Sequence, residues 1–157
     1  MIFAAHFVAY IKIIASALAF CYCLLSTCDE KNILIKATLS TCYAFMGYMV
    51  FYGWNTSWMD GVILLPLMYV GIWKIIQNKN IFLYVFSLAV AVISNFYIGF
   101  MLCIGSFILY VVQLLLSDGK FADNIKKSFI KYMFASLVGV GISAFLLIPT
   151  YLGLPSD

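Results

Sequence analysis

Residues 81–117 contain no charged side chain, and this run constrains the fold more than any other feature of the sequence. One helix needs roughly 20 apolar residues to cross a bilayer, so the run is too long for a single crossing. The polar pair Ser94-Asn95 divides it into two segments, 81–95 and 96–117. Only 10% of the whole chain is charged and 66% is hydrophobic, whereas soluble domains are about one quarter charged. The sequence therefore predicts an all-α integral membrane protein.

Charged and polar residues divide the rest of the chain into four more apolar segments. We expect the last of them to end at Pro149, because proline has no amide hydrogen to donate within a helix. Together the six segments predict a polytopic bundle of about six transmembrane helices, forming a single domain over 1–157. Trp58–Ile76 and Ile81–Tyr97 are short, so the alternative for them is a helical hairpin that dips into the membrane. The four further segments are 2–26, 33–53, 58–76 and 128–148.

The lysines predict the orientation of the bundle. Eight of the nine lysines fall on one face, in or beside the first, third and fifth connections, and the chain has no arginine. Lysine-rich connections stay in the cytoplasm, so Met1 is expected outside, together with 54–60, 94–97 and 149–157. The net charge of +3 and the lack of arginine do not favour a nucleic-acid-binding protein. The eight lysines are Lys31, Lys36, Lys74, Lys79, Lys120, Lys126, Lys127 and Lys131.

The cysteines and one series of small residues have a structural interpretation. The five cysteines lack the paired spacing of a metal site and are interpreted as small packing residues. Ala135, Gly139 and Ser143 recur every four positions, which is typical of helices that approach closely in lipid.

Asp60 is the most unusual residue on the predicted outer face. One interpretation makes it the cap of a helix that begins at Gly61, with Trp54 and Trp58 as interfacial residues. The other interpretation makes Asp60 a catalytic carboxylate that faces an outer cavity. The indoles of Trp54 and Trp58 would then bind a sugar ring or a prenyl chain, and Asn55 would bind sugar hydroxyls.

Three more residues are candidates for substrate binding. Asn95 is expected to cap the helix that follows it, and Asn95 and Tyr97 could both reach the layer of Asp60. Lys12 lies near the middle of an apolar helix, where a lysine costs roughly 2.5–3.5 kcal/mol on insertion scales. It should therefore face the bundle interior or an aqueous cavity. It could neutralise a phosphate, pair with a carboxylate or extend to the interface.

The order of the outward motifs resembles the YfhO family of bacterial membrane proteins, over roughly residues 10–154. The motifs are GYMVFYGWNTSWMDGVILLPL (47–67), SNFYIGFMLCIGSFILY (94–110) and LIPTYLGL (147–154). The resemblance implies a GT-C-like helical bundle in the bacterial plasma membrane, with its active site on the extracytoplasmic side. It also implies transfer of a sugar from an undecaprenyl-phosphate carrier to a cell-envelope acceptor such as a teichoic acid or a glycolipid. The partners would be membrane lipid, the polyprenyl-phosphate-sugar donor and the glycopolymer acceptor.

Members of the GT-C class use an inverting mechanism in which a carboxylate deprotonates the acceptor. A divalent metal assists some members and not others, and no metal ligand is assigned here. The leading aspartate of the class lies in a large loop after the first helix, which this chain lacks. We therefore expect a segment of a longer protein that is inactive alone, with Asp60 as an accessory acid or a contact to metal or acceptor. Lys12 would then face the carrier phosphate. The alternatives are a transporter or flippase-like bundle and a non-catalytic helper subunit.

Overall fold

The computed structural model describes residues 2–51, 55–116 and 125–152, and helices form almost all of this part of the chain. No strand occurs among these residues, which confirms the predicted all-α class. The helices are α1 (Ile2–Thr27), α2 (Ile33–Ala44), α3 (Gly47–Phe51), α4 (Thr56–Ile76), α5 (Phe82–Ser94), α6 (Phe96–Leu116) and α7 (Ile125–Leu152).

The predicted segments reappear as helices, with two differences. The second segment, 33–53, is divided into α2 and α3 by a turn at Phe45 and Met46, whose amides bond back to Thr41 and Tyr43. The predicted helix end at Pro149 is wrong, because α7 continues to Leu152. A proline removes one hydrogen bond from a helix but does not prevent the next turn from forming.

Three helices in the described part of the chain are long and apolar enough to cross a membrane. Their spans are His6–Thr27, Ser57–Ile76 and Phe96–Leu116. The apolar helices Ile33–Ala44 and Phe82–Ser94 are shorter, and a bilayer core about 30 Å thick needs roughly 20 helical residues. Six full crossings therefore remain a prediction.

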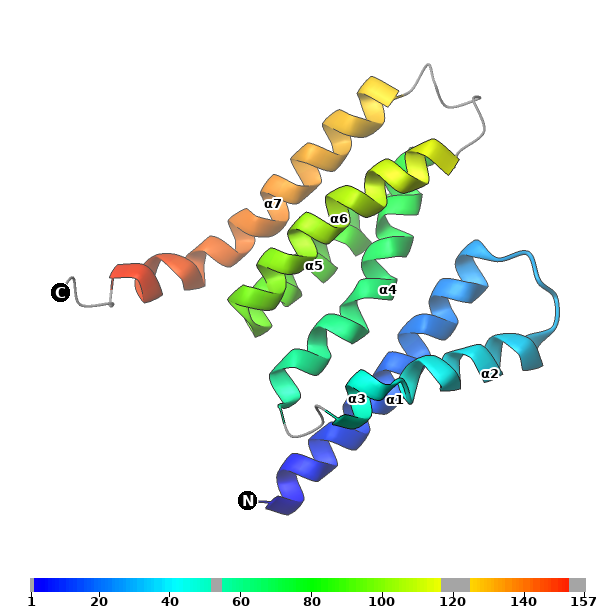
Figure 1. Ribbon diagram of the computed structural model, residues 1–157. Helices are drawn as coiled ribbons and strands as arrows, with labels where there is room; N and C mark the ends of the chain where they lie inside the picture. Colours follow the sequence, from blue (N-terminus) through cyan, green and yellow to red (C-terminus); the bar gives the residue numbers. More distant parts are fainter. Residues whose placement is uncertain (1, 52–54, 117–124, 153–157) are drawn as a thin grey trace.

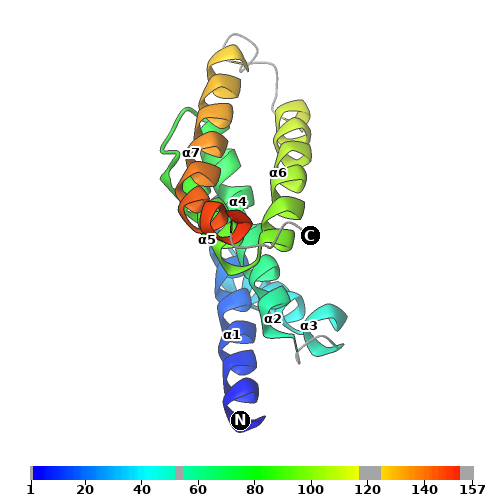
Figure 2. The same cartoon turned by 90° about the vertical axis from the view of Figure 1, so that its left-hand side faces the viewer.

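α5 is the innermost helix of the larger part of the bundle. It packs against α4, α6 and α7, and Figure 2 shows it among these helices. Tyr84 and Leu88 of α5 are fully buried, as are Ile72 and Ile75 of α4. α1 packs on α4 and on α2, and the two helices α1 and α2 form a separate arm beside α4 (Figure 1).

Small residues bring α7 close to α5, as their spacing predicted. Ala135, Gly139 and Ser143 are all buried, and Ser143 Oγ lies 3.3 Å from the carbonyl of Ala89. A Cβ atom at Gly139 would lie 3.0 Å from Leu88. The predicted packing role of this stripe is confirmed.

Lysine contacts gather several helix ends into one region, which we call the lysine end of the bundle. Lys36 Nζ donates to Cys28 O at 2.9 Å and Lys74 Nζ donates to Tyr22 Oη at 2.9 Å. Lys131 Nζ bonds to Asn78 Oδ1 at 3.0 Å in the turn between α4 and α5. The end of α1, the start of α2, the end of α4 and the start of α7 therefore lie at the same end.

Candidate functional site

Lys12 and Asp60 form an ion pair that joins α1 to α4 away from the lysine end. Lys12 Nζ lies 2.5 Å from Asp60 Oδ1, and the two side chains are only 20% and 22% exposed. Of the three roles predicted for Lys12, pairing with a carboxylate is the one that the structure shows. Each charge is expensive in apolar surroundings, and pairing offsets part of that cost.

The geometry of the helices explains why both charges lie at the same level. Asp60 lies about one turn from the start of α4, and Lys12 about three turns from the start of α1. The first turns of α1 extend beyond the start of α4 (Figure 1). Lys12 is therefore near the outer end of α4, although it is near the middle of its own helix.

Asp60 does not cap a helix. α4 begins at Thr56 with Asn55 as its N-cap, and Asp60 lies beyond the first turn. The alternative in which Asp60 caps a helix starting at Gly61 is therefore wrong. Asn55 itself makes no side-chain capping bond and is half-buried, and Trp54 lies outside the described residues.

The start of α6 packs beside Asp60 through a glycine. A Cβ atom at Gly61 would lie 2.8 Å from Ile98 Cγ2, so α4 and α6 are close there. Asn95 Oδ1 accepts hydrogen bonds from Tyr97 N at 3.0 Å and Ile98 N at 3.4 Å, which confirms the predicted cap. Tyr97 is 57% exposed. The structure thus brings the first turn of α6 next to the turn of α4 that holds Asp60.

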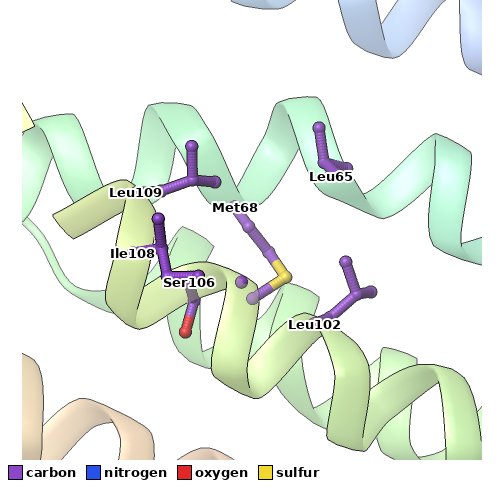
Figure 3. A pocket seen from close by; sticks show the side chains of 7 residues that line it. Leu65, Met68, Leu102, Ser106, Ile108 and Leu109 are labelled. Carbon is purple, nitrogen blue, oxygen red and sulfur yellow. The ribbon is translucent and has the colours of Figure 1, made fainter. Parts of the chain in front are cut away.

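An apolar groove begins beside Trp58 and runs along α4 and α6. Two adjoining cavities of about 330 Å³ and 240 Å³ form it, and both are lined by Leu65 and Leu102. Figure 3 shows the part around Met68. Ser106 lines the second cavity, and its hydroxyl is already bonded to Cys103 O. Tyr43 lines the first cavity, and its hydroxyl is bonded to Val62 O. The groove therefore suits an aliphatic chain. The first cavity is lined by Tyr43, Met46, Tyr48, Trp58, Gly61, Val62, Leu65, Ile98, Met101 and Leu102.

Sequence reasoning missed one contact of this region, between Tyr43 and α4. Tyr43 Oη donates to the carbonyl of Val62 at 2.7 Å. The available signal was Pro66, which cannot donate to the carbonyl four residues before it. The part of the chain that the structure describes holds no group of three His, Cys, Asp or Glu residues able to bind a metal ion.

Comparison with known proteins identifies the family. The family model described as bacterial membrane protein YfhO matches residues 1–157. No curated protein and no solved structure matches the chain. The match covers every residue and agrees with the apolar helices, so this chain is a membrane protein of the glycosyltransferase-like YfhO family.

Proposed function

We propose that this chain is the membrane segment of a glycosyltransferase that acts on the extracytoplasmic side. The reaction moves a sugar from an undecaprenyl-phosphate carrier to an envelope acceptor such as a teichoic acid or a glycolipid. Membership of the YfhO family supports the class. The observation that carries the assignment of the site is the Lys12–Asp60 ion pair, in which Asp60 directly precedes Gly61 of the groove lining.

The groove and Trp58 account for donor binding in this proposal. A prenyl chain is apolar, and the groove is lined almost entirely by apolar side chains. Trp58 lines its outer part, where an indole can cover either a prenyl unit or the face of a sugar ring. The further contacts proposed for the sugar are Asn55, Tyr97 and Trp54, of which Trp54 lies outside the described residues. The carboxamide oxygen of Asn95 already accepts a hydrogen bond as the cap of α6.

Asp60 and Lys12 supply the charges that the reaction needs. An acceptor hydroxyl oxygen attacks the anomeric carbon while the bond from that carbon to the carrier phosphate breaks. The phosphate leaves with the electron pair, and the hydroxyl proton passes to a carboxylate. Asp60 is held by Lys12 in the ion pair. A carrier phosphate that drew Lys12 toward itself would release the Asp60 carboxylate for the acceptor.

The test is sugar transfer by the complete protein in membranes supplied with undecaprenyl-phosphate-linked hexoses. We expect Asp60→Asn to lower the initial rate by about 10²–10⁴-fold, the range typical of general acid–base groups. Asp29→Asn is the matched control, since Asp29 is exposed in the connection at the lysine end. Normal transfer by Asp60→Asn at normal membrane abundance would rule out a catalytic role for this carboxylate.

A second candidate function is lipid or solute transport, because the groove opens along the side of α4 and α6. In proteoliposomes a transporter moves a labelled polyprenyl-phosphate sugar across the bilayer without an acceptor. Such movement, with no transfer of sugar to any acceptor, would favour transport over glycosyl transfer.

A further inference from the structure

The helix α4 contains a backbone carbonyl that its own residues cannot satisfy. In an α-helix the amide of residue i bonds to the carbonyl of residue i−4. Pro66 has no amide hydrogen, so the carbonyl of Val62 loses its partner within α4. A proline also bends the helix at this point, and the α4 ribbon changes direction along its length (Figure 1).

Tyr43 supplies the missing donor from another helix. Its hydroxyl lies 2.7 Å from the Val62 carbonyl, a short and well-formed hydrogen bond. An unsatisfied polar group in an apolar environment costs about 1–3 kcal/mol, so this bond has a large effect. The tyrosine therefore compensates for Pro66 at the bend itself.

The tyrosine ring is fixed on its other side by α1. The rings of Tyr43 and Phe20 are stacked, with centroids 4.3 Å apart and an interplanar angle of 8°. Tyr43 thus connects α1, the end of α2 and the bend of α4. The portion of α4 before Pro66 carries Trp58 and Asp60, while the portion after it is held at the lysine end by Lys74 and Tyr22.

We propose that Tyr43 is a positioning residue for the candidate site. Its hydroxyl fixes the bend of α4 and so keeps the outer portion, residues 56–65, where Asp60 meets Lys12. Without this bond the outer portion can pivot about Pro66, and the ion pair loses its geometry. The consequence for sugar transfer rests on the proposed function, whereas the placement of the outer portion does not.

Spin-label distances measure this placement directly. In the complete protein, with its cysteines replaced by alanine, one label pair replaces Phe7 of α1 and Ser57 of α4, both exposed. A control pair replaces Leu25 and Lys79, which are exposed at the lysine end. We expect Tyr43→Phe to shift and broaden the 7–57 distance distribution and to leave the 25–79 distribution unchanged.

Pro66→Ala provides the matched background, because alanine restores an amide donor to the Val62 carbonyl. In that background Tyr43→Phe should cause no further change in the 7–57 distances. In the protein that keeps Pro66, Tyr43→Phe should also lower the rate of sugar transfer by up to about 10²-fold. A small misplacement of a catalytic group can have an effect of this size. The phenylalanine keeps the ring that stacks on Phe20, so only the hydroxyl is tested.

The outcomes separate the two proposals. Unchanged 7–57 distances in Tyr43→Phe would overturn the positioning role, as would an equal change in the control pair. An effect of Tyr43→Phe that persists in the Pro66→Ala background would also overturn it. If the distances respond as expected but the unaltered protein transfers no sugar, Tyr43 still positions Asp60 and the proposed reaction is wrong.

Discussion

The charges of Lys12 and Asp60 are acceptable in this apolar chain because each lowers the cost of the other. Their side chains are about one fifth exposed, so water solvates them only in part. Removing one member of such a pair leaves the other charge only partly solvated and without its ion-pair partner, which destabilises more than the pair stabilises. The pair is therefore better explained by a role in function or specificity than by a gain in stability.

This asymmetry predicts a strong coupling between the two residues in the free energy of unfolding. We expect Lys12→Gln and Asp60→Asn each to destabilise the protein by about 1–3 kcal/mol. The double variant should be less unstable than the two losses combined, with a coupling energy of about 0.5–3 kcal/mol. Thermal unfolding of the complete protein in detergent measures the three variants and the unaltered protein, and strictly additive losses would show that the pair does not form.

At the scale of helices, glycines and hydroxyls determine how closely α4, α5, α6 and α7 approach. A Cβ atom at Gly71 would lie 2.8 Å from the backbone of Tyr84, so α4 and α5 are in contact there. The Tyr84 hydroxyl in turn lies 3.0 Å from Ser106 of α6 and 2.9 Å from Ser136 of α7. Tyr132 Oη also lies 2.9 Å from Ser106 Oγ. Buried hydroxyls satisfied in this way make one arrangement of the helices preferable to others.

Gly71→Ala should separate α4 from α5. The added methyl group meets backbone atoms, which cannot rotate away, so we expect a loss of about 1–3 kcal/mol in unfolding free energy. Gly105→Ala is the matched control, because no atom lies within 4 Å of its added Cβ and alanine favours a helix by about 1 kcal/mol. The measurement is the unfolding temperature of each variant by size-exclusion fluorescence. Equal or greater stability of Gly71→Ala would show that the two helices are farther apart.

At the scale of the whole molecule, the sequence predicted those features of the fold that depend on local patterns, namely the helices and one helix cap. Apolar runs and their polar dividers located the helices, and the cap at Asn95 followed from one carboxamide next to an apolar segment. The turn at Phe45 was not predicted, because residues 33–53 are apolar on both sides of it. The choice of Asp60 as the partner of Lys12, and of Val62 as the acceptor for Tyr43, depends on packing between distant segments. No local pattern specifies such contacts.

The orientation of the bundle is the prediction on which the extracytoplasmic reaction depends. Ser57 and Lys127 are exposed in the first turns of α4 and α7, and these helix ends are predicted to face opposite sides. Ser128 is a poor position for a label, because it is buried and its hydroxyl lies 3.4 Å from Tyr110 Oη.

In intact cells that express the complete protein without its native cysteines, a membrane-impermeant maleimide should label Ser57→Cys. It should label Lys127→Cys only after the membrane is permeabilised, since lysine-rich connections stay in the cytoplasm. Labelling of position 127 from outside, with position 57 protected, would reverse the orientation. Asp60 would then face the cytoplasm, where the proposed acceptor is absent.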